Sequence, residues 1–251
     1  MQRSILLYPA GATSAIHYAA HTLSQYGIPL ADHPSPDITH LLLDVPSFQP
    51  DGTLRGGRHP EAILDQLPSG ITVLGGNLTH PGLAAYPCMD LLKDPLYTAL
   101  NAGITAHCAL RVAAERMSRT FDKLPVLILG WGRIGKCLAA LLKSMGADVT
   151  VAARKPSDLA MLQALGYGTL ETEFLSGSLD RYRVLFNTIP AEILTEADLA
   201  QCSNCLKIEL ASGRMLPGSD VIQAAGLPGR YAPESSGELI AQTVIRLIKG
   251  V

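Results

Sequence analysis

A glycine-rich turn constrains this chain more than any other feature of its sequence. The turn, Gly130–Gly135 (GWGRIG), follows the continuous apolar run Leu124–Leu129 and opens Ile134–Met145, a segment of helical spacing that ends at Gly146. A buried strand, a G-x-G-x-x-G turn and a helix in this order form the fingerprint of a dinucleotide-binding βα unit. The first glycine permits the tight turn, the second lets the backbone approach the pyrophosphate, and the third lets the helix pack closely on the strand. A glycine-rich turn without a ligand is the alternative.

The helix that follows the turn is expected to present free N–H groups and the positive end of its dipole to the phosphates. The arginine inside the turn is also within reach of a phosphate. The residues predicted to bind the cofactor here are those of the whole turn: Gly130, Trp131, Gly132, Arg133, Ile134 and Gly135.

The segment after the next strand predicts which nicotinamide cofactor is bound. An acidic residue at the tip of this strand hydrogen-bonds the ribose 2′-hydroxyl of NAD. Here the strand is Val149–Ala153, and Asp148 lies at its start, which is the wrong end. The tip is followed instead by Arg154, Lys155 and Ser157. Two cations and a hydroxyl suit the 2′-phosphate of NADP, which a carboxylate would repel. We therefore expect NADP, with NAD less favoured; a solvated loop is the alternative.

Short apolar runs alternate with helical segments along the chain, which predicts an α/β fold with parallel sheets covered by helices. Residues 1–94 are expected to form a small flavodoxin-like α/β domain, and residues 95–120 a linking helix. Residues 121–251 are expected to form a Rossmann-type dinucleotide-binding domain with a doubly wound parallel sheet. A cleft between the two domains is expected to hold the substrate.

Individual elements are predicted from the same alternation. In the first domain they are Ser4–Tyr8, Ala12–Gln25, His40–Val45, Pro60–Gln66 and Ile71–Leu74. After the dinucleotide unit they are Asp158–Leu165, Val184–Asn187, Asp198–Gln201, Leu206–Leu210 and Val221–Ala225. The last helix is predicted at Ser236–Lys249, with Ser235 or Ser236 as its N-cap. Its apolar face is expected to pack on the core, on the first domain or on a second subunit, which leaves a homo-oligomer open.

Composition excludes several classes of function. The formal net charge is −2 over 251 residues, which provides no electrostatic footprint for nucleic acid. No apolar run approaches the roughly 20 residues that span a bilayer, so no membrane is expected as a partner. Five cysteines without a framework pattern favour a reduced, cytoplasmic compartment. The seven histidines lack paired-ligand spacing and Cys202–Cys205 lacks a second cysteine pair, so no metal is expected.

Five stretches of the second half occur here in combination. They are VLILGWGRIG (126–135), GADVTVAAR (146–154), FNTIP (186–190), LAS (210–212) and GLPGRYAPESSGELIA (226–241). Together they resemble the family formed by the A subunit of dipicolinate synthase. The last stretch is the most specific, since many reductases share the glycine turn. The resemblance is strongest over residues 90–251.

This resemblance implies an NADP-dependent oxidoreductase that acts on a dihydrodipicolinate-like cyclic dicarboxylate. It also implies a part in making dipicolinate during sporulation, and a partner in the form of a flavoprotein-like B subunit. Two alternatives stay open. One is a non-catalytic NADP-binding subunit or sensor that needs a partner, and the other is a reductase of another small carboxylate, such as a ketoacid or an imine.

Two segments after predicted strands are candidates for the reacting end of the cofactor. The backbone of Asn187, Thr188, Ile189 and Pro190 is expected to flank the cofactor ribose, unless these residues form an ordinary turn. In the next loop, Ser212 is expected to hydrogen-bond the nicotinamide carboxamide. Arg214 is expected to pair with a substrate carboxylate, although a lone loop arginine is also typical of a solvated surface.

The linking helix offers candidates for proton transfer. His107 is a histidine near the point where the two halves should meet, and histidine carries protons near neutral pH. Arg111 is four residues further along and shares its helix face. The two are expected to present cations to an anionic substrate, while a structural role is the alternative for His107. The predicted catalytic set is therefore His107, Arg111, Ser212 and Arg214.

Overall fold

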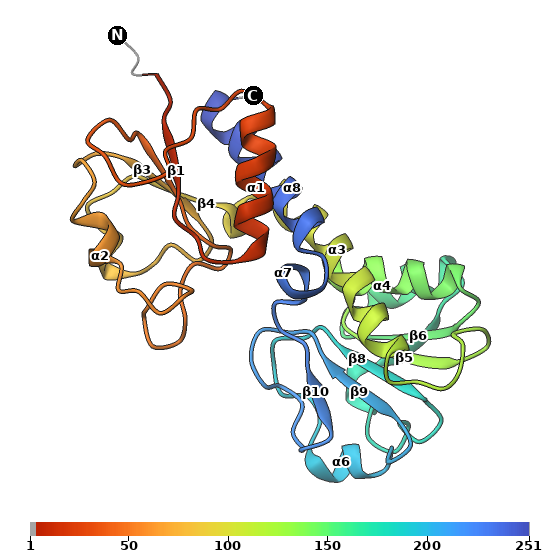
Figure 1. Ribbon diagram of the computed structural model, residues 1–251. Helices are drawn as coiled ribbons and strands as arrows, with labels where there is room; N and C mark the ends of the chain where they lie inside the picture. Colours follow the sequence, from red (N-terminus) through yellow and green to blue (C-terminus); the bar gives the residue numbers. More distant parts are fainter. Residues whose placement is uncertain (1–3, 251) are drawn as a thin grey trace. The chain divides into compact units, whose positions relative to one another are not determined.

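The computed structural model describes residues 4–250, which divide into two compact units. The first unit holds the residues up to Asn101 together with those from Pro228 onward, and the second holds Ala102–Leu227. The chain passes between the units inside helix α3 (Pro95–Ala114) and again at helix α7 (Leu227–Tyr231) (Figure 1). The second unit therefore ends well before residue 251, the end predicted for the dinucleotide-binding domain.

The first unit is built on a four-stranded parallel sheet in the order β1-β2-β3-β4. Its strands are β1 (Leu7–Pro9), β2 (His40–Leu42), β3 (Thr72–Gly75) and β4 (Cys88–Asp90). Its helical elements are α1 (Ser14–Gln25), α2 (Glu61–Leu64), η1 (Pro81–Leu83), η2 (Leu91–Lys93) and α8 (Pro233–Lys249). Leu41 of β2, Leu43 just after this strand and Val73 of β3 are almost fully buried in one apolar cluster with α2 residues Ile63 and Leu64. This burial supplies the main stabilisation of the unit.

Helix α8 packs against α1 within the first unit (Figure 1). The contact is close at Gly237, where a Cβ atom would lie 2.6 Å from the Ala15 carbonyl oxygen and 2.5 Å from Tyr18 Cβ. The helix begins at Pro233 and has no side-chain cap, so the prediction of Ser235 or Ser236 as N-cap is wrong. Proline has the φ angle that the first helical position needs, which explains the earlier start.

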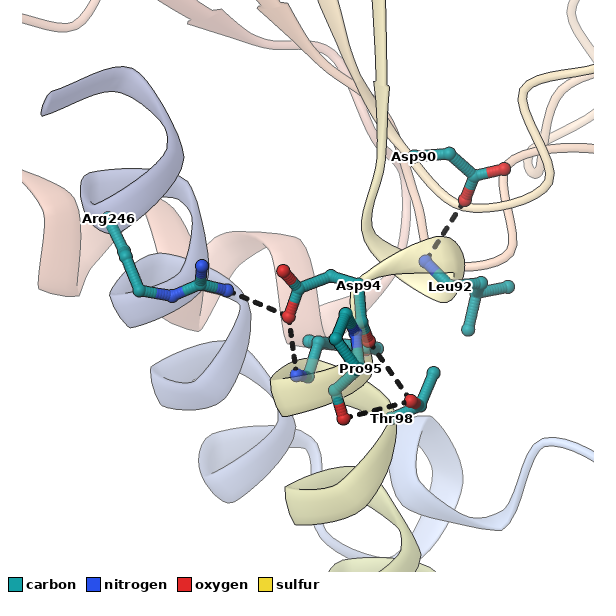
Figure 2. A network of polar contacts seen from close by, with 7 residues as sticks. Asp90, Leu92, Asp94, Pro95, Thr98 and Arg246 are labelled. Carbon is teal, nitrogen blue, oxygen red and sulfur yellow. Dashed lines mark hydrogen bonds and ion pairs between the residues drawn. The ribbon is translucent and has the colours of Figure 1, made fainter. Parts of the chain in front are cut away.

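A polar network ties α8 to the start of α3 (Figure 2). Asp94 caps α3, because its Oδ1 accepts a hydrogen bond of 2.7 Å from the Tyr97 backbone N–H. The same oxygen lies 2.7 Å from Arg246 Nη2 of α8. The hydrogen bond from Arg246 is the main reason that the pKa of Asp94 lies below its usual value.

The second unit is a six-stranded parallel sheet in the order β10-β9-β8-β5-β6-β7. Its strands are β5 (Pro125–Leu129), β6 (Asp148–Ala153), β7 (Gly168–Glu171), β8 (Val184–Asn187), β9 (Leu206–Glu209) and β10 (Val221–Gln223). Its helical elements, besides most of α3, are α4 (Arg133–Ser144), α5 (Pro156–Ala164), η3 (Thr172–Phe174) and α6 (Glu196–Ala200). The chain runs outward from β5 to β7 and then crosses to β8, on the other side of β5. This order confirms the predicted doubly wound α/β fold, and its topological switch point lies between β5 and β8.

Candidate functional site

Four loops of the second unit leave the sheet at one edge and at one level. The register pairs Leu129 of β5 with Ala152 of β6 and with Asn187 of β8, and it pairs Asn187 with Glu209 of β9. Because all the strands are parallel, the segments that follow these residues emerge together at the carboxyl edge. Ligands of doubly wound sheets bind at this edge beside the switch point.

Each glycine of the turn after β5 meets a different geometric demand. Gly130 has a φ of +101°, and a Cβ atom there would lie 2.6 Å from Thr188 Oγ1. A Cβ atom at Gly135 would overlap the carbonyl oxygen of Gly130, so only glycine lets α4 approach the strand this closely. At Gly132, apart from its two chain neighbours, no residue of the described range 4–250 has an atom within 4 Å of the Cβ position, so the space before the helix is open. A dinucleotide-binding turn requires these three features.

The start of helix α4 is available to an anion. Its N-cap is Gly132, which has no side chain to occupy the first N–H groups of the helix. The side chain of the adjacent Arg133 is exposed and forms no hydrogen bond or ion pair within residues 4–250. Ile134 is half-buried. Trp131 packs edge-on against Tyr167, with 5.8 Å between the ring centroids, so its ring is held by the protein.

The tip of β6 presents unpaired cations. Arg154, Lys155 and Ser157 are all exposed, and within the described part of the chain none of their side chains forms a hydrogen bond or an ion pair. Lys155 is the N-cap residue of α5. The acid at this level of the sheet is Glu171, which faces Ala153 from β7, one strand further from the switch point. The positions directly after β6 therefore carry positive charge only.

The loop after β8 is fixed to the end of β5. The Thr188 backbone N–H and hydroxyl both donate to the Leu129 carbonyl oxygen, at 3.0 and 2.8 Å. This places Thr188 directly over Gly130, at the switch point. Ile189 is half-buried and also lies against Gly130, while Pro190 is exposed. The loop thus forms one wall beside the glycine turn.

Asn187 has a different position from the rest of its loop. Its side chain is fully buried; its Nδ2 donates to Glu209 and to the Ile189 carbonyl oxygen, and its Oδ1 accepts from the Ile189 N–H. All of these groups belong to the protein. The Asn187 side chain therefore shapes the loop from inside, while its backbone stays a predicted neighbour of the cofactor ribose, with Thr188, Ile189 and Pro190.

Glu209 is the residue that sequence reasoning missed. Its side chain is 1% exposed at the end of β9, and its carboxylate accepts hydrogen bonds from four N–H groups. These come from the Asn187 side chain and from the backbone of Ala211, Met215 and Leu216, at 2.8–3.1 Å. The carboxylate thereby fixes both ends of the loop 211–216. The signal in the sequence was a charged residue inside the apolar run LKIEL, where burial requires a full set of partners.

Ser212 and Arg214 lie on the loop that Glu209 holds. Both side chains are exposed, and neither forms a hydrogen bond or an ion pair with the rest of residues 4–250. Gly213, between them, has a φ of +103°, which gives the loop its sharp turn. Arg214 lines a hollow of about 490 Å³ together with residues 192–196, Met215 and Pro217. The hollow lies outside β8 and β9, at the carboxyl edge.

His107 and Arg111 lie on α3, in the part of that helix that belongs to the second unit. Both are exposed. The Nε of Arg111 forms an ion pair of 2.9 Å with Glu115 Oε1, one turn further along the helix. No hydrogen bond of the described residues joins His107 to the carboxyl-edge loops. Ser212 and Arg214 are therefore adjacent on one loop, whereas His107 and Arg111 belong to a separate element.

The cysteine pair is separate from this edge. Cys202 and Cys205 are free thiols before β9, each less than a tenth exposed. Burial raises the pKa of Cys205 to about 12, so its thiolate is scarce at neutral pH. Within residues 4–250, no group of three or more histidine, cysteine or acidic side chains is arranged to hold a metal ion. None of the helices over the same residues has the length and apolarity needed to cross a bilayer.

Comparison with known proteins identifies relatives over most of the chain, although no family model matches it. The A subunit of dipicolinate synthase from Bacillus subtilis (strain 168) is 27% identical over 200 residues, which cover 74% of this chain and 67% of that protein. The crystal structure of the same subunit from Bacillus halodurans matches with a TM-score of 0.81 and 21% identity, covering 97% of both chains. A transhydrogenase from Sinorhizobium meliloti matches with a TM-score of 0.69 and 13% identity, covering 98% of this chain and 93% of that one.

The resemblance predicted from the motifs is confirmed by these relatives. The solved structures share the fold of this chain, and D-2-hydroxyacid dehydrogenases are among the further neighbours. The glycine turn and the switch point are features of a Rossmann-type fold, and these neighbours share that fold with the chain.

Proposed function

We propose that this chain, a relative of the dipicolinate synthase A subunit, is an NADP-dependent oxidoreductase that acts on a dihydrodipicolinate-like cyclic dicarboxylate. The observation that carries the proposal is the carboxyl edge of the second unit. Three segments leave the sheet there at one level. They are the open glycine turn, the two cations after β6, and the loop that carries Arg214 and is held by the buried Glu209 carboxylate. The cofactor, when bound, supplies the hydride chemistry.

The residues present fit a dinucleotide. The open space at Gly132 and the uncapped start of α4 suit the pyrophosphate. Arg154 and Lys155 suit a 2′-phosphate, since both are exposed cations without a partner in the described chain. Thr188 and Ile189 close the other side of the turn, where the cofactor ribose would lie. These features favour NADP over NAD.

In this proposal the loop after β9 binds the nicotinamide end of the cofactor and the substrate. Ser212 binds the nicotinamide carboxamide, and Arg214 binds a substrate carboxylate through its planar, bidentate guanidinium. Neither side chain is used by the protein itself, within residues 4–250. Glu209 acts underneath as a positioning residue, because it fixes the backbone that carries both. His107 and Arg111 are proposed to present a proton carrier and a cation to the substrate.

A partner is part of the proposal. The relatives are each named as one subunit of a synthase, so we propose that a flavoprotein-like B subunit completes the assembly in the cytoplasm. The side chains of Ser212 and Arg214 have no partner within residues 4–250, which also favours one alternative, a cofactor-binding subunit without turnover of its own. A reductase of another small carboxylate would use the same edge, since Arg214 recognises a carboxylate of any origin.

Calorimetric titration with pyridine-2,6-dicarboxylate (dipicolinate) tests the substrate. The proposal predicts binding to the chain saturated with NADPH, and at least about tenfold weaker binding without cofactor. Arg214→Gln should weaken this binding by about tenfold or more, whereas the exposed control Glu173→Gln should leave it unchanged. Absence of dipicolinate binding under both conditions would remove the dicarboxylate substrate, and tight binding without turnover would favour the subunit without activity of its own.

A further inference from the structure

The hollow beside Arg214 has an unusual balance of charge. Its lining residues include one basic residue, Arg214, and two acidic ones, Glu192 and Glu196. The rest of its lining is apolar or neutral, with Ile193 and Met215 among its members. Its formal charge is therefore negative, although the candidate substrate is an anion.

The three charged side chains do not neutralise one another. All three are exposed, and within residues 4–250 none of them forms an ion pair or a side-chain hydrogen bond. Glu192 lies on the loop between β8 and α6, Glu196 opens α6, and Arg214 comes from the loop after β9. Two strand-end loops thus present opposite charges to one hollow of about 490 Å³ and leave both unpaired.

Complementarity decides which ligand suits such a lining. A bare dicarboxylate would meet one cation and two like charges, and like charges in a partly enclosed site cost affinity. A ligand with a carboxylate and a protonated amine could satisfy both signs at once. Apolar Ile193 and Met215 suit the carbon frame that joins the two groups.

We propose that this hollow selects a small ligand that carries a protonated amine together with its carboxylate, with the carboxylate on Arg214 and the amine toward Glu192 and Glu196. The claim that this ligand is the substrate rests on the proposed function. It narrows the substrate class to cyclic amino acids whose ring nitrogen is protonated when they bind.

Two ring compounds of nearly equal size differ in the charge on the ring nitrogen, so comparing them tests the role of that charge. Piperidine-2,6-dicarboxylate carries a protonated ring amine at neutral pH, whereas pyridine-2,6-dicarboxylate carries an uncharged ring nitrogen. Their affinities are measured by calorimetry on the full chain with saturating NADPH and again without it. We expect the piperidine compound to bind at least about tenfold more tightly, a preference that corresponds to one well-placed charge contact.

Variants assign the preference to residues. The double variant Glu192→Gln/Glu196→Gln should bring the ratio of the two affinities close to one, and Arg214→Gln should weaken both compounds. Glu173→Gln, an exposed acid on η3, is the matched control and should change neither affinity. Because these side chains are exposed, the variants should fold, which circular dichroism checks.

The outcomes distinguish this inference from the proposed function. Equal binding of the two compounds, tighter binding of the pyridine compound, no binding of either, or an unchanged ratio in the double variant would each overturn the inference. A chain that binds NADPH and dipicolinate but shows such a result keeps the proposed function. If the chain binds no NADPH but still binds the piperidine compound more tightly than the pyridine compound, the proposed function is contradicted and the selectivity of the hollow is supported.

Discussion

Glu209 provides a quantitative test of how the site is held together. In the variant Glu209→Gln one carboxylate oxygen becomes an NH2 group of nearly the same size. If the retained oxygen keeps Met215 and Leu216, the new NH2 faces the Ala211 N–H, and a donor meets a donor. One buried N–H then loses its acceptor, which costs about 1–3 kcal/mol, and the remaining bonds become weaker neutral ones. We expect the free energy of unfolding to fall by about 2–5 kcal/mol in total.

Urea unfolding followed by circular dichroism measures this loss, with Glu173→Gln as the exposed control that should stay within about 0.5 kcal/mol of the parent. The loop 211–216 would also lose its fixed form, so the affinity for dipicolinate in the presence of NADPH should fall more than the affinity for NADPH itself. A Glu209→Gln variant as stable as the control would refute the assignment of a buried, fully satisfied carboxylate.

Three further predictions concern the turn, the α8 network and the thiols. Gly135→Ala should weaken NADPH binding by about tenfold or more and reduce stability by about 1–3 kcal/mol, since its Cβ would overlap the Gly130 carbonyl; unchanged titration and unfolding curves would contradict this. Because the folded pKa of Asp94 is lowered from 3.8, its stabilisation is full above that pH and is lost as the pH falls through the folded value. Asp94→Asn should therefore lower stability at pH 7 by about 0.5–1 kcal/mol and by less at pH 3, and an equal deficit at both pH values would count against it. Exposed Cys88 should react with iodoacetamide in the folded protein long before Cys202 or Cys205, as peptide mass mapping would reveal; early labelling of the pair would argue against their burial.

The second unit was predictable where apolar runs were long and uninterrupted. Val184–Asn187 has the predicted bounds, and the strand before the glycine turn differs by a single residue at its start. These strands are buried on both faces, so their sequences contain little else than apolar residues. The βα fingerprint also predicted which strand begins the dinucleotide unit.

Two strands were missed for the opposite reason. Cys88–Asp90 and Gly168–Glu171 are edge strands with exposed residues, so they carry neither an apolar run nor a clear alternation. The position of the last helix also escaped prediction in part, because its apolar face could have been covered by several surfaces. The structure shows that α1 is its neighbour, with the closest approach at Gly237.

The sequence predicted the segments that form the candidate site but not the residue that supports them, Glu209. The turn, the cations after β6 and the loop with Arg214 are local patterns that a sequence displays directly. Glu209 was missed because its partners are mostly backbone N–H groups, and residue types in the sequence do not indicate which backbone groups will bind a side chain. The bonds of the Asn187 side chain to Glu209 and to its own loop were missed for the same reason, while the placing of its backbone beside the cofactor ribose stays a prediction.

Titration of the purified chain with NADPH and with NADH tests the central claim most directly. Trp131, the single tryptophan, lies in the glycine turn and reports binding by fluorescence quenching. The proposal predicts that NADPH binds at least about tenfold more tightly than NADH, and that Arg154→Ala/Lys155→Ala removes this preference while leaving NADH affinity unchanged. Tighter binding of NADH, or a preference for NADPH that survives the double variant, would contradict the assignment of these cations to a 2′-phosphate. Failure to bind either dinucleotide would contradict the cofactor site itself.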